Sequence, residues 1–431
     1  LTAMVMKLLE KAPEHRYQSA LGLHADLVRL TQALAEGIEP HFELAERDYP
    51  TSLQMPQRLL GRSTQLFELQ RSLAEVRARN EARLVFVTGE AGIGKSAILR
   101  ALERPPDGRL ARGRFVDANS DGPFRGFAEA FGDLIGQLIE DHEGHDRSRQ
   151  VEWRERLRER LGPLLDVLGD FVPALAGLFG RRQLPLGSPA GFGLAEATNR
   201  VQIAVRRFLA ALAESGPLVI LLDDVQRADP SSLELLRGLA SGLAGPVLIV
   251  VAATPASEPT RASSIEGHEG HALDAMRREL VAGGQALAIE LGPLALPDLE
   301  AMLTTMLGRG AAEVRELAEL LLDRTGGNPL FVRKYLRELD ESGRLALGDE
   351  GWAWDLSAIA AAPLPADPLA LIRSRLDRLA PELRSLLDRA ACIGTHFDLA
   401  GLRALHRADD DHEAELARCL HELERREILV R

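Results

Sequence analysis

The octapeptide Gly-Glu-Ala-Gly-Ile-Gly-Lys-Ser at residues 89–96 constrains the fold of this 431-residue chain more than any other feature. It follows a short apolar run at 83–88, and apolar residues at helical spacing follow it at 95–103. The pattern G-x-x-x-x-G-K-[ST] between a buried strand and a helix is typical of a loop that binds phosphate groups. The sequence therefore predicts an α/β core with a phosphate site at the end of its first strand.

Each residue type in this loop has a chemical reason to be there. Gly89, Gly92 and Gly94 let the backbone bend so that successive N–H groups face a phosphate. Lys95 would place an ammonium on the β- and γ-phosphates of a nucleotide, and the Ser96 hydroxyl would bind Mg²⁺. Lys95 is one of only four lysines in the chain, which indicates a task that arginine does not perform. The residues expected to bind the nucleotide here are Gly89, Glu90, Ala91, Gly92, Ile93, Gly94, Lys95, Ser96 and Ala97.

A second apolar run, at 217–222, ends in two acidic residues, Asp223 and Asp224. In phosphate-binding enzymes of this kind an acid at such a position holds the magnesium ion, so we expect Asp223 to bind Mg²⁺, directly or through water. Asp224 would lie near the attacking water, as base or as the group that orients it. The predicted catalytic residues are thus Lys95, Asp223 and Asp224, and the predicted metal ligands are Ser96 and Asp223.

Composition narrows the class of protein. The net charge is −12 and aromatic residues make up only 4% of the chain, so neither bulk attraction to nucleic acid nor a stacking platform for single strands is expected. The longest apolar run is far too short to cross a bilayer. Two cysteines, Cys392 and Cys419, do not make a disulfide framework, which favours a reducing cytoplasm. The start at Leu1 suggests a piece of a longer protein.

The order of the predicted elements indicates several domains. Strands are expected at 83–88, 114–118, 217–223, 246–253 and 286–291, with helices between them, which predicts a parallel sheet covered by helices. The segment at 255–284 is polar and is expected to be partly mobile. The expected organisation is a helical start at 1–35, a linker at 36–58, an α/β core at 59–291 with a helical insertion at 141–195, a helical lid at 292–358 and a last helical domain at 359–431.

Further short motifs are spread over almost the whole chain. They are Leu60-Gly61-Arg62, Glu196-Ala197-Thr198-Asn199-Arg200, LDDVQRAD at 222–229, Thr325-Gly326-Gly327-Asn328-Pro329-Leu330-Phe331, the W-x-W-D element at 352–355 and the segment Ala390 to Asp398. Together with the loop at 89–96 they resemble the STAND/AAA group of P-loop signalling ATPases. In particular, they resemble the ATPase module found behind bacterial serine/threonine kinase domains.

The resemblance implies ATP with Mg²⁺ as cofactors and adds residues to the site. Gly61 and Arg62 would lie near the adenine, and Pro329 would border the base and connect the core to the lid. Residues 359–431 would be an incomplete winged-helix domain that closes over the nucleotide. Because 409–411 are all aspartate, a structural winged helix is favoured over one that binds DNA.

The first residues resemble the end of a protein-kinase C-lobe. The stretch LLEKAPEHRYQSA at 8–20 is similar to a kinase pattern in which the arginine, here Arg16, pairs with a glutamate. An ordinary helix–turn–helix is the alternative. The Gly-rich loop, ATP-binding lysine and catalytic loop of a kinase do not occur in this sequence, so the chain is not expected to phosphorylate a substrate by itself.

The sequence departs from the family at two positions that bear on hydrolysis. Pro255 stands where the family carries an arginine after the fourth strand, and Arg227 stands in place of a tryptophan. Arg227 either supplies the missing cation or is a solvated surface residue. Asp229, directly before Pro230, suits a helix N-cap better than catalysis. The sequence His-Glu-Gly-His occurs at 142–145 and 268–271; solvated loops are favoured over a metal site there.

Three functions compete on this basis. The first is a nucleotide-dependent switch that hydrolyses ATP slowly and regulates an attached serine/threonine kinase. The second is a scaffold that is stabilised by bound nucleotide and does not hydrolyse it. The third is an ATP-dependent transcription regulator. The expected partners are ATP or ADP, the attached kinase, further signalling domains and a second copy of the chain; no membrane partner is expected, and nucleic acid is disfavoured.

Overall fold

The computed structural model describes residues 1–10, 16–17, 19–37, 42, 44–45, 48, 59–116, 123–140, 147–179, 194–256, 267–348, 351–361, 376, 379–393, 397, 399, 401–402, 411–425 and 428–429. The chain forms two compact units, Leu1–Ile359 and Ala360–Arg431. Each unit is described here by itself.

A five-stranded parallel sheet forms the centre of the first unit. Its strands are β1 (Arg83–Thr88), β2 (Arg109–Arg114), β3 (Leu218–Asp223), β4 (Val247–Ala253) and β5 (Ala286–Glu290). Their order across the sheet is β2-β3-β4-β1-β5, and every neighbouring pair is parallel. The prediction of an α/β fold with a helix-covered parallel sheet is therefore confirmed. Because the strands are parallel, β1, β2 and β3 all end at one edge of the sheet.

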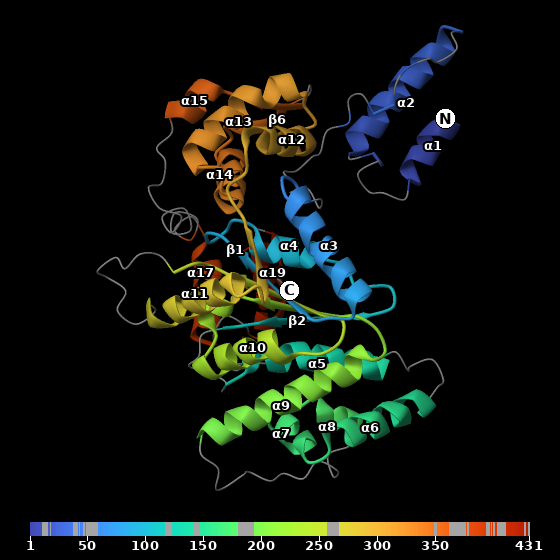
Figure 1. Ribbon diagram of the computed structural model, residues 1–431. Coiled ribbons are helices and arrows are strands. Elements are labelled where there is room, and N and C mark those ends of the chain that lie inside the picture. The colour runs from blue at the N-terminus through green and yellow to red at the C-terminus, as the bar shows by residue number, and fades with distance from the viewer. Residues whose placement is uncertain are drawn as a thin grey trace. The chain divides into compact units, whose positions relative to one another are not determined.

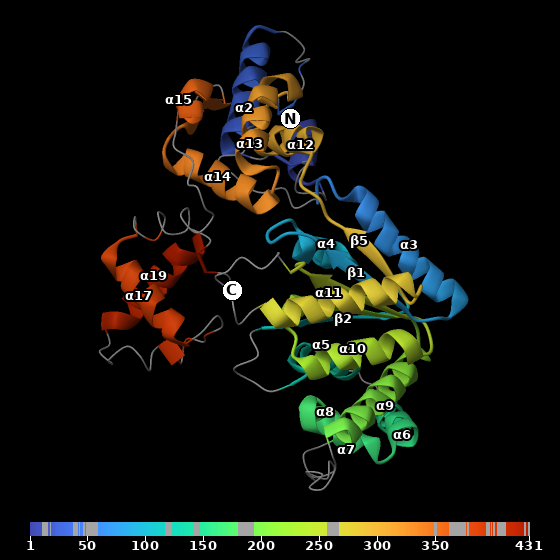
Figure 2. The ribbon, with the colours of Figure 1, turned by 60° about the vertical axis from the view of Figure 1, so that its left-hand side comes forward.

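Both faces of the sheet are buried, which explains why its central strands are apolar throughout. Alternate residues of β1 belong to different cores: Leu84 and Phe86 pack on one side, and Val85 and Val87 pack on the other. Two helices cover the second face, α3 (Ser63–Arg79) and α4 (Lys95–Ala101). The first face is covered by α5 (Arg125–Glu140), α9 (Leu194–Ala213), α10 (Pro230–Gly242) and α11 (Gly267–Ala282). Figures 1 and 2 show these two layers on opposite sides of the sheet.

Three further helices extend the first face beyond α9. They are α6 (Arg147–Leu161), α7 (Leu164–Phe171) and α8 (Leu175–Phe179), and they share the core of that face. Phenylalanines join this insertion to the core: the rings of Phe131 and Phe208 lie 5.6 Å apart, and those of Phe131 and Phe171 lie 6.4 Å apart. The described part of 141–195 is thus helical, as the sequence predicts.

The second strand is not where the apolar residues at 114–118 predict it; it lies at Arg109–Arg114, so that prediction is wrong. β2 is an edge strand, and its outward residues Arg112 and Arg114 are exposed, so it has no continuous apolar run. Gly113 permits close packing of α5 on β2, because a Cβ at this position would meet the Gly126 carbonyl oxygen.

Part of the segment at 255–284 also differs from expectation. Residues 267–282 form the regular helix α11, which buries Leu273, Met276 and Leu280 against the sheet. The spacing of these residues is helical, but polar residues on the rest of the helix hide the pattern. The copy of His-Glu-Gly-His at 268–271 therefore starts a helix and is not a loop, whereas the copy at 142–145 lies outside the described residues.

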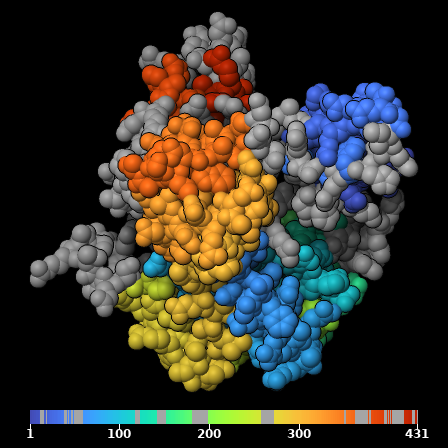
Figure 3. Space-filling model, turned by 90° about the horizontal axis from the view of Figure 1, so that it is seen from above, coloured from blue at the N-terminus to red at the C-terminus, as the bar shows by residue number. Residues whose placement is uncertain are grey.

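The rest of the first unit after β5 is a small domain with a core of its own. It comprises α12 (Leu296–Leu307), α13 (Ala311–Thr325), α14 (Pro329–Glu341), the antiparallel hairpin of β6 (Leu345–Gly348) and β7 (Gly351–Trp354), and α15 (Leu356–Ala361). Trp352 of the hairpin is buried in this core. We call these residues the lid. Figure 3 shows its surface, in orange, as one continuous body.

Helices also occur at both ends of the chain. Residues 1–35 contain α1 (Thr2–Leu8) and α2 (Ala20–Ala35), and the Ser19 hydroxyl caps α2 by accepting a hydrogen bond from the Gly22 N–H at 3.0 Å. The described elements of the second unit are α17 (Pro381–Ile393) and α19 (Asp411–Arg425). They share a core that includes Leu386 and Leu423. The kinase-like and winged-helix assignments of these two segments remain predictions.

Candidate functional site

The loop between β1 and α4 has the backbone conformation that its glycines permit. Gly92 and Gly94 have φ angles of 77° and 107°, in a region that residues with a Cβ rarely adopt. A Cβ on Gly92 would lie 2.6 Å from the Cβ of Leu330, so a side chain there would also clash with the lid. Glu90 and Ala91 are exposed at the tip, whereas Ile93 is buried. The loop is thus a tight backbone turn with one apolar anchor.

Lys95 is folded back over this loop. Its side chain is only 7% exposed, and its Nζ donates hydrogen bonds to the carbonyl oxygens of Gly89 and Glu90, both at 2.8 Å. Burial lowers the pKa of Lys95, while the carboxylates of Asp224 and Asp223 act in the opposite direction. The structure therefore brings Lys95 under the electrostatic influence of both predicted acids, at the edge of the sheet where their strands end.

Asp223 is the last residue of β3, and Asp224 follows it in a left-handed conformation with φ of 54°. The turn lets the Asp223 carboxylate accept a hydrogen bond from the Asp224 N–H at 3.0 Å. The Asp224 side chain is directed to β2, where its Oδ2 lies 2.8 Å from Nε of Arg114. This hydrogen bond raises the pKa of Arg114. The sequence did not single out Arg114 as a site residue, because only the pairing of β2 with β3 brings it to the acids.

Gln226 connects Asp224 to the end of β4. Its Nε2 donates to Oδ1 of Asp224 at 3.1 Å, and its Oε1 accepts from the Thr254 N–H at 3.1 Å. The residue after Thr254 is Pro255, which has no side-chain cation to offer. Arg227 is exposed, which agrees with a surface role. In the described part of the site, the cation that contacts Asp224 is therefore Arg114 of β2.

Arg62 lies beneath the phosphate loop. It is only 4% exposed, and its guanidinium donates to the carbonyl oxygens of Ile93 at 3.0 Å and Gly292 at 2.6 Å. Burial lowers the pKa of Arg62, and the charge of Asp298 partly offsets this effect. Gly61 has a φ angle of 67°, and a Cβ there would meet the Asp298 carboxylate. Gly61 and Arg62 therefore connect the loop to the chain that enters the lid.

The lid contacts the loop through the start of α14. Asn328 is buried; its Oδ1 accepts from the Leu330 N–H at 3.0 Å as the N-cap, and its Nδ2 donates to the Ala91 carbonyl oxygen at 2.9 Å. The Leu330 N–H also lies 3.3 Å from the Gly92 carbonyl oxygen. Pro329 is the first residue of α14, so the fold places it beside these contacts. Asn328 is therefore a site residue, although the sequence analysis assigned a role only to its neighbour Pro329.

The oxygen atoms of Ser96 and Asp223 suit a magnesium ion. Mg²⁺ takes hard oxygen ligands and commonly keeps one or two protein ligands, with water and phosphate oxygens completing its shell. Ser96 opens α4 and is half-buried, as is Asp223. Among the described residues, no group of three or more His, Cys, Asp or Glu side chains is arranged to hold a metal ion.

Asp229 has the predicted structural role. Its Oδ1 accepts from the Ser232 N–H at 3.0 Å, and Pro230 begins α10 directly after it. The prediction of an N-cap is therefore confirmed. Asp229 also accepts a hydrogen bond from the Phe124 N–H at 3.2 Å, so the cap fixes the start of α5 as well.

Comparison with known families agrees with this geometry. Residues 58–251 match the family model of the AAA ATPase domain. Residues 58–251 are therefore similar to an AAA ATPase domain. The match covers the phosphate loop, both acids and Arg114. It ends in β4 and does not reach the lid or the second unit.

Two curated relatives are named as histidine kinases. The chain is 24% identical over 489 residues to hybrid signal transduction histidine kinase G of Dictyostelium discoideum, and this alignment covers 93% of the chain and 14% of the relative. It is 26% identical to histidine protein kinase 1 of Candida albicans, over 55% of the chain and 11% of that relative. The chain thus spans about one seventh or less of either relative. Their names contain histidine kinase, not the serine/threonine kinase that residues 8–20 predict.

One solved structure that aligns with the chain is titled as the structure of Drosophila ORC bound to DNA. It is 12% identical to this chain, the alignment covers 92% of this chain and 91% of the other, and the TM-score is 0.37. At this TM-score the comparison adds nothing to the topology described above. A membrane-crossing role is not supported by any helix in the described part of the chain, since none is both long and apolar enough.

Proposed function

We propose that the AAA-type domain binds ATP with Mg²⁺, hydrolyses it slowly and acts as a nucleotide-dependent switch. The observation that carries the proposal is the position of Lys95, which is buried in a glycine-bent loop and under the influence of Asp223 and Asp224. When a nucleoside triphosphate binds, its phosphate oxygens replace the carbonyl oxygens of Gly89 and Glu90 as partners of the Lys95 ammonium. Phosphate oxygens are stronger partners than neutral carbonyls because the hydrogen bonds are charge-assisted.

The residues of the site would divide phosphate binding, magnesium binding and water orientation among them. The backbone N–H groups of 89–96 and the Lys95 ammonium bind the phosphates, while Ser96 and Asp223 supply oxygen ligands to Mg²⁺. The ion, when bound, neutralises charge on the phosphate oxygens. Asp224 orients the attacking water once one of its carboxylate oxygens is released from its present partners.

The lid supplies the moving part of the switch. Asn328 and Leu330 contact the carbonyls of Ala91 and Gly92, so a phosphate that reshapes the loop also changes what the lid can touch. Arg62 makes a second connection, from the Ile93 carbonyl to the Gly292 carbonyl. A switch needs differential contacts in its two states, and these four hydrogen bonds are the contacts that would differ.

The output that we propose is control of a kinase in the same protein. Two relatives that match 93% and 55% of this chain are named as histidine kinases, which supports a signalling kinase as the partner. The resemblance of residues 8–20 to a kinase C-lobe supports a serine/threonine kinase. Autophosphorylation of the whole protein, with and without Lys95→Ala, tests the coupling, and analysis of the phosphorylated residue as histidine or as serine or threonine identifies the kinase.

The first test is ATP binding beside ATP turnover. Calorimetric titration with ATP and Mg²⁺, and phosphate release, are measured for the wild-type chain, Lys95→Ala and Arg100→Ala. Arg100 is an exposed cation in the last turn of α4 and serves as the matched control. Binding and turnover that Lys95→Ala abolishes and Arg100→Ala preserves support the switch. Equal ATP affinity in Lys95→Ala contradicts it, and binding without turnover in the wild type favours the non-hydrolysing scaffold.

A further inference from the structure

The two edges of the central sheet differ in how the chain covers them. At the β2 edge, α5 supplies carboxylates to the outward N–H groups of the strand. The Arg112 N–H donates to Oδ2 of Asp133 at 3.2 Å, and the Arg114 N–H donates to Oε2 of Glu129 at 2.9 Å. Cover of this kind prevents an edge strand from pairing with another chain.

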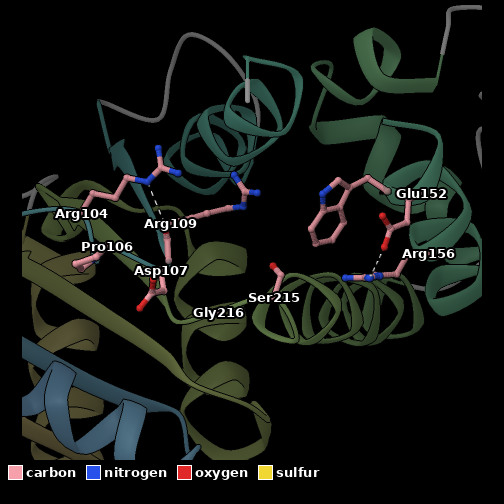
Figure 4. Close-up of a pocket in the computed structure, with 10 residues that line it drawn as sticks. Arg104, Pro106, Asp107, Arg109, Glu152, Arg156, Ser215 and Gly216 are labelled. Carbon is pink, nitrogen blue, oxygen red and sulfur yellow. Dashed lines mark hydrogen bonds and ion pairs between the residues drawn. The ribbon is translucent and has the colours of Figure 1, made fainter. Parts of the chain in front are cut away.

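Other parts of the same chain cover the rest of the β2 edge. Nε2 of Gln137 in α5 donates to the Leu110 carbonyl oxygen at 2.7 Å. Figure 4 shows Arg109, the first residue of β2, facing α6 across a cavity of about 310 Å³. The Arg109 guanidinium carbon lies 5.8 Å from the centroid of the Trp153 ring of that helix. The β2 edge is therefore closed to a partner strand.

The opposite edge, formed by β5, has no such cover. The Leu291 N–H donates to the Thr88 carbonyl oxygen of β1 at 2.8 Å, and successive residues of a strand direct their backbone groups to alternate sides. The N–H and C=O groups of Ala286, Ala288 and Glu290 therefore point away from β1. Within the described parts of the chain, these outward groups have no hydrogen-bond partner. Figure 2 shows β5 between α3 and α11, at the margin of the sheet.

The open edge of β5 is complementary to a copy of itself. In an antiparallel pair with a twofold axis at Ala288, this residue lies opposite its own copy, and Ala286 lies opposite Glu290 of the second copy. Every outward backbone group then has a partner, because such opposite residues exchange both of their hydrogen bonds. Leu287, which is 44% exposed, lies opposite Ile289, and no like charges meet along the strand. The edge therefore fits a second β5 in one specific register.

Charged side chains of α3 lie beside this edge. Glu75 and Arg79 line one small cavity with residues 284–287 at the start of β5, which identifies the side of α3 that faces the edge. Glu68 lies on the same side as Arg79, because 11 residues make about three helical turns. Both are exposed, and neither has a bond or ion pair with another described residue. They are about 16 Å apart along the helix, too far to pair with each other.

The rotation that pairs the strands also sets the two α3 helices antiparallel on one face of the joined sheet. Glu68 of each copy then lies opposite Arg79 of the other, so the interface gains two ion pairs. α3 packs over β1 and β4, so the two helix axes are separated by three strand spacings or more, about 14 Å. A helix with its side chains is about 10–12 Å across, so long charged side chains are the ones that can meet over this distance.

We propose that the β5 edge and the adjacent side of α3 form an interface with a second copy of this chain, related to the first by a twofold axis at Ala288. The two sheets then continue into each other, and one surface patch serves both copies, as in other twofold interfaces. Main-chain hydrogen bonds provide the attraction, and the charges of Glu68 and Arg79 fix the register. The proposal does not depend on nucleotide binding.

Sedimentation equilibrium of the whole chain without nucleotide tests this interface separately from the ATP proposal. The wild-type chain should dimerise reversibly. Glu68→Arg and Arg79→Glu each place like charges in both contacts and should weaken dimerisation at least tenfold, because like charges repel across an interface. Gln70→Arg changes an exposed residue on another side of α3 and should change the Kd by less than twofold.

A mixture of the two charge variants gives the most specific result. Glu68→Arg has arginine at both positions and Arg79→Glu has glutamate at both, so each variant alone repels its own copy. A mixed pair has opposite charges in both contacts. An equimolar mixture should therefore form a heterodimer whose Kd is within about threefold of the wild-type value.

Substitution of Ala288 tests the position of the axis. Ala288→Lys places two lysines opposite each other and should weaken dimerisation at least tenfold, whereas Ala288→Ser adds no charge and should leave the Kd within twofold. Ala288 is exposed, so both variants should keep the wild-type melting temperature. The proposal is overturned if the wild type stays monomeric up to millimolar concentrations or if the mixture of charge variants stays monomeric. Dimerisation of Ala288→Lys with the wild-type Kd overturns it too.

Discussion

Arg114 and Asp224 form an ion pair across the ends of two neighbouring strands, with Nε and Oδ2 2.8 Å apart. The register of β2 and β3 places Arg114 beside Asp223, and the left-handed turn at Asp224 directs the next carboxylate back to Arg114. The other carboxylate oxygen accepts a hydrogen bond from Gln226. Both oxygens of the residue proposed to orient water are therefore engaged, and we expect these two bonds to compete with the water for Asp224.

Arg114→Ala is expected to raise ATP turnover about 3- to 10-fold, because it frees one oxygen of Asp224 for water; positioned general bases contribute about 10²–10⁴-fold in total. ATP affinity should change by less than about twofold, since Arg114 contacts no part of the phosphate loop among the bonds described above. Phosphate release at saturating ATP measures the effect. Arg112→Ala, two residues away on the same strand, is the control. Unchanged or lower turnover in Arg114→Ala would show that the ion pair does not restrain Asp224.

Lys95 should make the free energy of unfolding of the nucleotide-free protein depend on pH. Burial lowers its pKa in the folded state, so between that pKa and the ordinary value near 10.4 the unfolded chain binds more protons. The free energy of unfolding contributed by Lys95 therefore rises as pH increases through this window, and the penalty for the buried charge is fully present below it. Urea denaturation at several pH values should show a steeper rise for the wild type than for Lys95→Met. Parallel curves for the two proteins would contradict the burial argument.

Much of this site follows from local sequence, and the missed parts are those set by tertiary contact. The phosphate loop and the acids after β3 are found by motif because glycine geometry, an ammonium and a carboxylate are required at neighbouring positions. Arg114 is different, since it lies on an exposed edge strand whose alternating polar residues do not stand out. Only the pairing of β2 with β3 shows that it meets Asp224.

The lid also combines features that local sequence predicts with contacts that only the tertiary structure shows. Its helices at 296–307, 311–325 and 329–341 agree closely with the helical spacing of their apolar residues. The bond from Asn328 to Ala91 joins residues 237 positions apart, and no periodicity in the sequence contains this information. The second strand was placed wrongly and helix α11 was not predicted, for a related reason: both have one buried stripe and a polar exposed face.

Asn328→Ala should loosen the contact between the lid and the phosphate loop. It removes the bond to Ala91 and the N-cap of α14, and loss of a cap lowers the free energy of unfolding by about 1 kcal/mol. Nucleotide dissociation is expected to accelerate about 3- to 10-fold, because the lid then closes less firmly on the loop. Stopped-flow release of a fluorescent ATP analogue measures this rate. Asp355→Ala is the control, because it removes the cap of α15 and should lower the free energy of unfolding without changing the rate of nucleotide dissociation. If both variants change this rate equally, Asn328 has only a structural role.

Arg62→Gln should destabilise the first unit by about 2–4 kcal/mol, because hydrogen bonds that involve a charged group contribute about 1.5–3 kcal/mol each and the two carbonyls of Ile93 and Gly292 would lose their donor. ATP affinity should fall in parallel, since Ile93 anchors the phosphate loop. Urea denaturation and calorimetry measure the two effects. Arg71→Gln, on helix α3, which begins directly after Arg62, is the matched control: its ion pair with Glu75 is exposed, so this variant should lose much less stability than Arg62→Gln. A similar loss of stability in both variants would mean that burial of Arg62 contributes nothing specific to the loop.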